Sequence, residues 1–246
     1  MRFSLVSVSS LLLLLSTSAT ALLSGKTAQQ GDYPYALSLQ RYGAHICNGV
    51  LLSARTALTA AHCVTAGQGI ETYPARSFQV RVGSPQRSAG GVLAQVESFV
   101  VHRSYAGGLN DLALVQLQQP LTLTPQIQPI AVAKQAPATD SALSYVGWGS
   151  TAAQSSALSQ SLQSGSLKTV SAADCEKQLY LADAGLLCLA SAKDQGMCLG
   201  DAGAPAVFDK QLVGIGAFYV QGCDSTLPNG FMSVAHYSEW IETHIR

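Results

Sequence analysis

The chain has 246 residues, enough for one large β domain or two small ones with a full hydrophobic core. Its 14 Lys and Arg residues balance 14 Asp and Glu residues, so no excess charge favours a nucleic acid or a membrane surface as partner. Apolar residues make up 48% of the chain and aromatic residues 7%, which excludes an intrinsically disordered protein.

Residues 1–21 have the pattern of a secretory signal peptide. Arg2 gives a positive start, an apolar run centred on residues 11–15 follows, and Ala19-Thr20-Ala21 is the small-x-small pattern that signal peptidase cuts. The alternative is an N-terminal membrane anchor, but the run is too short to span a bilayer comfortably. We therefore expect a secreted, extracellular protein that does not act at a membrane and whose mature part is residues 22–246.

Short windows of alternating apolar residues predict antiparallel strands. Residues 35–40 and 78–82 alternate between apolar and other side chains, as half-buried strands do. Residues 111–117 and 211–220 are more continuously apolar and indicate strands that are buried on both faces. Glycines and prolines recur between these windows, which favours an all-β sandwich or barrel.

The stretch 150–166, STAAQSSALSQSLQSGS, is either an inter-domain linker or an exposed loop. Strand-like sequence continues on both sides of it, so we expect a loop that runs into a strand. The last segment, AHYSEWIETHIR, instead predicts a helix. Its apolar side chains share one helical face and are expected to pack onto the core; they are Tyr237, Trp240, Ile241, His244 and Ile245.

Six cysteines lie in the mature part, and an even number in an oxidising compartment predicts disulfides. They are Cys47, Cys63, Cys175, Cys188, Cys198 and Cys223. Their spacing alone leaves many pairings open. No Cys-x-x-Cys pair occurs, and the histidines outside LTAAHC are scattered along the sequence, so no metal site is expected.

Three segments carry the chemistry when they are taken together. LTAAHC contains His62, LNDLALVQL contains Asp111, and GDAGAP contains Ala202 on a glycine-flanked turn. In this order they resemble the three triad motifs of the trypsin/chymotrypsin family of serine proteases, and GWG at residues 147–149 resembles a further signature of that family. The resemblance extends from Leu22 to Arg246.

The resemblance implies a chymotrypsin-like fold, in which two six-stranded β-barrels are followed by a C-terminal helix. It also implies one disulfide pairing among those that the sequence leaves open. The implied bridges are Cys47–Cys63, Cys175–Cys188 and Cys198–Cys223.

The nucleophile position departs from the family pattern. Family members carry Gly-Asp-Ser-Gly-Gly-Pro at this turn, whereas this chain has Ala202 in place of the serine. In the triad, His accepts the serine proton and Asp fixes the orientation of the His, so His62 and Asp111 have no hydroxyl to activate. The resemblance also places the oxyanion hole at the backbone of Gly200 and Ala202.

The substrate pocket departs from the pattern as well. The resemblance assigns it to Gly196, Ala217, Phe218, Tyr219 and Gly230. Gly196 stands where trypsin-like enzymes carry the aspartate that binds Lys or Arg, which excludes that specificity. Tyr219 replaces a glycine, and its phenol is expected to narrow or fill the entrance.

The stretch Leu22-Leu23-Ser24-Gly25 aligns with the family's activation sequence, and Leu22 directly follows the expected signal cut. In the family, the new amine binds the carboxylate that corresponds to Asp201. Signal peptidase alone could therefore release the Leu22 amine to pair with Asp201. The alternative is a cut elsewhere, which leaves Asp201 with hydrogen bonds only.

These features predict a secreted serine protease homologue without endopeptidase activity. It needs no cofactor, is expected to be a monomer, and acts by binding proteins or peptides as a regulator, cofactor or decoy. The alternatives are an active serine endopeptidase, if Ala202 is a variant or sequence error, and a lectin-like or structural β protein.

Overall fold

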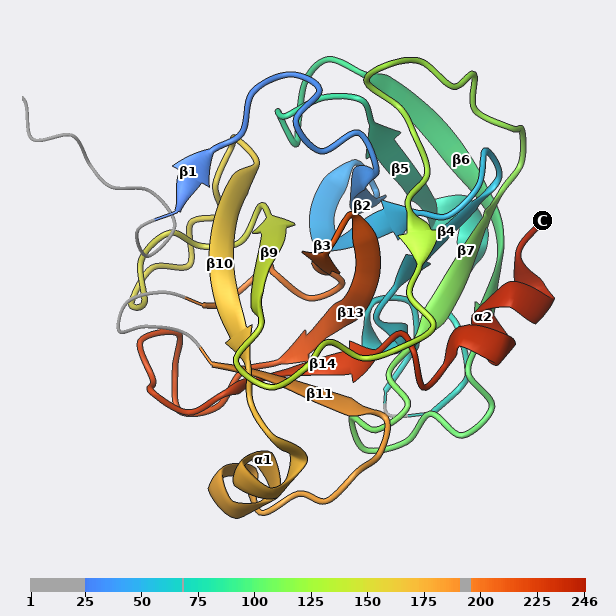
Figure 1. The fold of residues 1–246 in the computed structure, drawn as a ribbon. Helices are drawn as coiled ribbons and strands as arrows, with labels where there is room; N and C mark the ends of the chain where they lie inside the picture. Colours follow the sequence, from blue (N-terminus) through green and yellow to red (C-terminus); the bar gives the residue numbers. More distant parts are fainter. Residues whose placement is uncertain (1–24, 68, 191–195) are drawn as a thin grey trace, which may run out of the picture.

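The computed structural model describes residues 25–67, 69–190 and 196–246. Its strands form two barrels that pack side by side (Figure 1). The predicted all-β, two-barrel fold with a C-terminal helix is confirmed. The signal peptide and Leu22 fall outside the described residues.

The first barrel is closed in the order β2-β3-β4-β7-β6-β5. Its strands are β2 (Ala36–Arg41), β3 (Ala44–Leu51), β4 (Thr56–Thr59), β5 (Phe78–Val82), β6 (Val92–Val101) and β7 (Ala113–Leu117). In β5, Phe78, Val80 and Val82 point into the core and alternate with half-buried residues. Every residue of β7 is buried, because this strand lies where the two barrels meet.

The second barrel closes through pairing of β9 with β10. Its strands are β9 (Ala142–Gly147), β10 (Gln163–Thr169), β11 (Leu186–Ala190), β12 (Pro205–Phe208), β13 (Gln211–Phe218) and β14 (Asn229–Ser233). Two short strands extend the sheet: β1 (Lys26–Thr27) pairs with β10, and β8 (Ala131–Val132) pairs in parallel with β13. The stretch 150–166 is a loop that runs into β10, as predicted.

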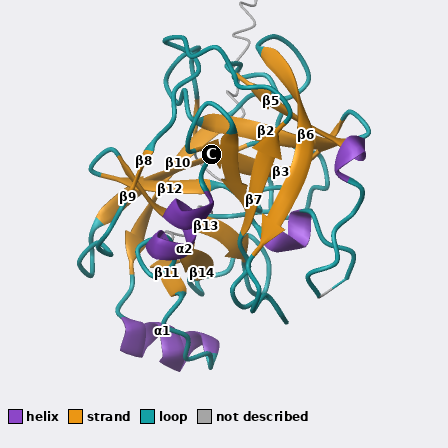
Figure 2. Cartoon of the chain, turned by 90° about the vertical axis from the view of Figure 1, so that its right-hand side faces the viewer, coloured by secondary structure: helices purple, strands orange, loops and turns teal. Residues whose placement is uncertain are grey.

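Two α-helices and two 3-10 turns complete the described fold. The expected C-terminal helix is α2 (Ser238–His244), and it packs on the first barrel, where Gln116 Nε2 donates to His244 O at 3.0 Å. Helix α1 (Ala172–Leu179) was not predicted, and it projects from the second barrel (Figure 2). Ser171 caps α1 by accepting from the Asp174 N–H at 3.1 Å, a local hydrogen bond that sets where the helix begins.

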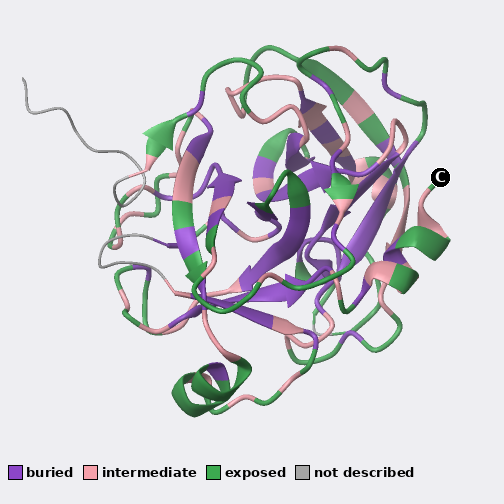
Figure 3. Ribbon diagram, in the orientation of Figure 1, coloured by how far each residue is buried: buried purple, intermediate pink, exposed green. Residues whose placement is uncertain are grey.

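Both barrels have apolar interiors, and exposed residues concentrate in the loops and α1 (Figure 3). The three implied disulfides, Cys47–Cys63, Cys175–Cys188 and Cys198–Cys223, are all formed. Each closes a loop and is worth about 2–4 kcal/mol in a domain of this kind. Within the described residues no helix has the length and apolar character needed to cross a membrane.

Candidate active site

The first barrel places His62 and Asp111 in direct contact. His62 lies on the 3-10 turn η1 (Ala61–Cys63) that follows β4, and Asp111 directly precedes Leu112 and β7. Asp111 Oδ2 lies 2.6 Å from His62 Nδ1, and Asp111 Oδ1 accepts the His62 backbone N–H at 2.8 Å. Two hydrogen bonds from one carboxylate fix both the ring and the backbone of His62.

The surroundings of His62 raise the pKa of its imidazole. Partial burial lowers its pKa, but the hydrogen bond and the negative charge of Asp111 outweigh burial, and the net pKa is raised above the ordinary value. The Asp111 side chain is only 3% exposed, whereas that of His62 is 39% exposed. The imidazole is therefore held from inside and open to solvent on its outer side.

The second barrel contributes the turn that carries Ala202. Gly200 and Gly203 adopt φ angles of 88° and 78°, which glycine reaches without strain. A β-carbon on Gly203 would also overlap the Asn48 carbonyl. Ala202 packs against the core cluster of the first barrel that contains Ala61 and Cys63, the neighbours of His62. The turn therefore has the glycine conformations that the expected nucleophile turn requires, and position 202, where the resemblance implies the nucleophile, carries a methyl group.

The backbone of this turn still presents donors. Within the described part of the chain, the N–H groups of Gly200 and Ala202 have no acceptor. Two free N–H groups on one turn are what an oxyanion hole requires.

Asn48 is a site residue that the sequence did not reveal. Its Nδ2 donates to Gly200 O at 2.8 Å and, more weakly, to Ala202 O at 3.3 Å, while its Oδ1 accepts from the Trp148 N–H at 3.0 Å. Its own backbone N–H donates to Ala202 O at 2.7 Å. One side chain of β3 thereby ties the turn to the GWG segment, and only the packing of the two barrels brings these segments together.

The hydroxyl group of Thr59 lies close to the turn that carries Ala202. A β-carbon on Gly203 would meet the Thr59 hydroxyl as well as Asn48 O. Thr59 is fully buried, and its Oγ1 donates to Asn48 O at 2.7 Å. A hydroxyl that is buried and already bonded to a carbonyl is not poised to attack a substrate.

Asp201 is fully buried and is held by backbone amides. Its Oδ1 accepts from the Gly149 N–H at 2.9 Å, and its Oδ2 accepts from the Cys198 N–H at 3.0 Å. Burial raises its pKa to about 7, although both hydrogen bonds act to lower it. Among the described residues no cation pairs with this carboxylate.

The predicted pocket wall carries bulky side chains. A β-carbon on Gly230 would overlap the Phe218 ring, and one on Gly216 would meet the Met197 side chain. Tyr219 packs against the apolar cluster of the second barrel that contains Met197. At the pocket base, Gly196 O accepts from the Tyr145 hydroxyl at 2.7 Å, and Ala217 is buried in the neighbouring core.

A metal site has little support in the described residues. Cys47, His62 and Cys63 bring potential ligand atoms within 4.8 Å of one another, but both sulfurs form the disulfide. Three histidines that are far apart in the sequence or on separate elements lie around two rings of the α2 region. His102 and His236 contact Tyr237, and His102 and His244 contact Trp240. Such edge contacts are packing interactions and do not form a ligand set.

The comparisons with known proteins agree with this geometry. The family model described as Trypsin matches residues 22–241, so the chain belongs to the trypsin family. It is 35% identical to serine protease SP24D of Anopheles gambiae over 222 residues, which cover 90% of this chain and 80% of that protein. It is 33% identical to trypsin beta of Drosophila erecta over 224 residues, covering 88% and 85%.

Two solved structures extend the likeness. Neuropsin, a serine protease expressed in the limbic system of mouse brain, matches with a TM-score of 0.80 and 25% identity, covering 89% of this chain and 97% of that one. The scabies mite inactivated protease paralogue S-D1 matches with the same TM-score and identity, covering 89% and 94%. The chain is therefore a trypsin-family serine protease homologue with a chymotrypsin-like fold.

Proposed function

We propose that this protein is a secreted serine protease homologue that does not cleave peptides and that acts by binding proteins or peptides. The observation that carries the proposal is Ala202, which stands at the nucleophile position of an otherwise built turn. Acyl transfer requires a nucleophilic oxygen or sulfur, and a methyl group supplies neither.

The size of the expected loss supports this proposal. Removing the nucleophile of a triad costs on the order of 10⁶ in turnover, while binding and an oxyanion hole leave about 10³–10⁴ over water. Thr59 does not replace the missing group, because its hydroxyl is buried and bonded to Asn48 O. A trypsin fold without a nucleophile can still act by binding, as a regulator, cofactor or decoy.

The comparisons contain precedents for both activity states. One structural neighbour is named as an inactivated protease, which agrees with the proposal. Other relatives are named as trypsins, and the intact contact between His62 and Asp111 favours an active endopeptidase as the second candidate. That candidate requires a serine at position 202.

The first test compares the wild-type protein with Ala202→Ser, both purified from the secreted fraction after the gene has been re-sequenced. Each is treated with a fluorophosphonate serine label and assayed on casein. We expect no label at position 202 and no casein cleavage for the wild type, and labelling of Ala202→Ser. Casein cleavage by purified wild type would overturn the proposal.

The binding role is tested by affinity capture from the native secretion, with partners identified by mass spectrometry. Wild type is compared with Tyr219→Gly, which removes the phenol from the pocket wall. Capture of proteases or their protein inhibitors by wild type, and altered capture by Tyr219→Gly, is the expected result. If neither protein captures proteases, inhibitors or peptides, the binding role fails, even if the protein is inactive.

Secretion and signal cleavage are part of the same proposal. The three disulfides among the described residues suit an oxidising compartment. N-terminal sequencing of secreted material is expected to begin at Leu22, and a different first residue would remove the amine proposed to pair with Asp201.

A further inference from the structure

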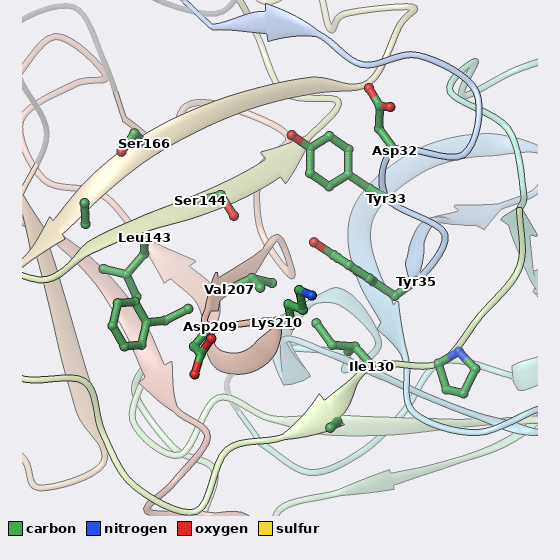
Figure 4. A pocket seen from close by; sticks show the side chains of 14 residues that line it. Asp32, Tyr33, Tyr35, Ile130, Leu143, Ser144, Ser166, Val207, Asp209 and Lys210 are labelled. Atoms are coloured by element: carbon green, nitrogen blue, oxygen red, sulfur yellow. The ribbon is translucent and has the colours of Figure 1, made fainter. Parts of the chain in front are cut away.

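A cavity of about 850 Å³ lies where β9, β10 and β12 of the second barrel meet the segments before β2 and β8 (Figure 4). None of the triad, oxyanion-hole or pocket-wall residues lines it. Its volume falls within the range of about 300–1,000 Å³ that is typical of small-molecule sites. The cavity is therefore a second candidate site, separate from the candidate active site around His62, Asp111 and Ala202.

The cavity has an apolar floor and an aromatic side. Ile130, Leu143 and Val207 lie at its base and are nearly fully buried, and Tyr33 and Tyr35 extend beside them with their ring centroids 6.2 Å apart and their planes at 73°. Both rings also pack against the core cluster that contains Trp148. These aromatic surfaces are therefore held in place before any ligand arrives.

Hydroxyl groups converge on the same space. Ser144 on β9 lies directly opposite Ser166 on β10 and beside Val207 on β12, so three neighbouring strands form one wall. The hydroxyls of Tyr33 and Tyr35 complete the set (Figure 4). Across the described part of the chain, none of these four hydroxyls has a hydrogen-bond partner, nor does the Lys210 ammonium. Unpaired donors beside apolar surface are the usual composition of a ligand site.

The turn between β12 and β13 provides an independent observation. Asp209 and Lys210 form a two-residue hairpin loop with φ angles of 47° and 61°. A hairpin of this kind favours Asn-Gly or Asp-Gly, so Asp209 suits its position, whereas Lys210 places a β-carbon where glycine is preferred. Both residues of this strained turn line the cavity. Strained backbone positions cluster at functional sites, which makes Lys210 a candidate for a functional role.

The charges around the cavity indicate the ligand. Asp209 and Lys210 are adjacent and of opposite sign, and the third charged residue, Asp32, already accepts the Gln29 N–H at 2.8 Å. An anionic ligand would be repelled by the two carboxylates, and a cationic ligand would be repelled by the Lys210 ammonium. We propose that the cavity binds a neutral saccharide, whose C–H face packs on the tyrosine rings while its hydroxyls bond to the serine, tyrosine, lysine and aspartate groups.

The experiment is an NMR titration of the mature protein with maltotriose and, separately, chitotriose, each at up to about 10 mM, ten times a Kd of about 1 mM. Octanoate and phenethylamine serve as anionic and cationic probes. We expect a saccharide to shift amide signals of residues 142–144 and 207–210. If both sugars leave these signals unmoved, or only a charged probe moves them, the proposal is wrong.

Matched variants separate direct contacts from general effects. Ser144→Ala and Tyr35→Phe each remove one hydroxyl and are expected to weaken saccharide binding about threefold to tenfold, the range of one net hydrogen bond. Tyr42→Phe is the control, because Tyr42 is 79% exposed and lies outside the cavity. Equal affinity for all three variants would overturn the assignment.

Variants of the hairpin separate an effect on stability from an effect on saccharide binding. Asp209→Asn combined with Lys210→Gly installs the preferred turn sequence. We expect a higher Tm together with weaker saccharide binding, because the strain is relieved and both charged contacts are lost. A higher Tm with unchanged binding would show that the turn does not contact the ligand. Since the cavity does not include Ala202, this proposal stands or falls independently of the proposed function.

Discussion

The two barrels differ in how much of the triad machinery they keep. The first barrel has His62 and Asp111 with both of their hydrogen bonds, whereas the second barrel has Ala202 at the proposed nucleophile position and Tyr219 in the proposed pocket wall. Asp111 is buried and bonds to the backbone as well as to the ring of His62, so its loss would disturb the fold. The side chain at position 202 makes no comparable bond, and the fold tolerates its loss.

The same distinction holds within the nucleophile turn. Gly203 has no room for a β-carbon, and Asp201 accepts two backbone amides. Position 202 contributes its backbone carbonyl to the Asn48 N–H, a bond that is independent of side chain. The fold therefore constrains Asp201 and Gly203, the two residues that flank position 202, more strongly than it constrains the side chain at position 202.

The largest expected effect comes from repairing the second barrel. Ala202→Ser supplies the proposed nucleophile, but Tyr219 and Phe218 remain at positions where we expect them to narrow the pocket. We expect Ala202→Ser combined with Tyr219→Gly to hydrolyse peptide substrates at least about tenfold faster than Ala202→Ser alone, a difference of about 1.4 kcal/mol in the barrier. The measurement is kcat/KM on a peptide library. If Ala202→Ser alone matches an active trypsin, the pocket is not altered as we infer.

The next effect concerns Asp201 and pH. Burial raises the pKa of the Asp201 carboxyl to about 7. In protein without an amine paired to Asp201, the folded state therefore binds the carboxyl proton more tightly than the unfolded state does. Its stability is therefore expected to fall between pH 4 and 7, by at most about 1.4 kcal/mol per pH unit. The measurement is urea unfolding between pH 4 and 7 on an extended form of the protein, which carries extra residues before Leu22. It gives the slope of the free energy of unfolding against pH.

The mature form that begins at Leu22 provides the contrast. If its amine pairs with Asp201, the carboxylate is stabilised and the decline in stability between pH 4 and 7 disappears. Asp201→Asn in the extended form is the control, because it removes the titrating group. Identical slopes for the extended and mature forms would rule out the proposed pair between Leu22 and Asp201.

A smaller effect is expected at Asn48, which joins the barrels. Asn48→Ala leaves the Trp148 N–H without its partner and leaves Gly200 O with only the longer contact to His45 Nε2 at 3.4 Å. We expect the free energy of unfolding to fall by about 1–3 kcal/mol, as for other buried groups that lose a hydrogen bond. Chemical denaturation measures this, with exposed Gln119→Ala as control. A loss no larger than that of the control would show that Asn48 does not hold the turn.

The smallest expected effect is a change in the pKa of His62 in the first barrel. Asp111→Asn removes the charge that raises the His62 pKa, while burial, which lowers it, remains. NMR titration of the imidazole is expected to show a lower pKa in the variant. The stabilisation from this pair is fully present below the unfolded His pKa of about 6.5 and is lost as pH rises through the raised folded pKa. An unchanged His62 pKa would mean that Asp111 does not act on the ring by charge.

The sequence by itself determined the fold class, the disulfide pairs through the family resemblance, and the contact between His62 and Asp111. Periodicity predicted the strands, while motifs in a fixed order carried the resemblance that implied the two-barrel fold, the disulfide pairs and the contact between His62 and Asp111. It also showed that position 202 lacks a nucleophilic group, because the identity of a side chain can be read from the sequence without a structure.

Only the tertiary structure decided which distant groups share a space. Asn48 reaches the turn across the barrel interface, three histidines meet around Tyr237 and Trp240, and Ser144 faces a cavity with Tyr35. Helix α1 was missed because its short sequence has a single buried residue, Cys175, and hence no apolar stripe. Contacts between residues far apart in the chain depend on how the two barrels pack, and no local pattern encodes that packing.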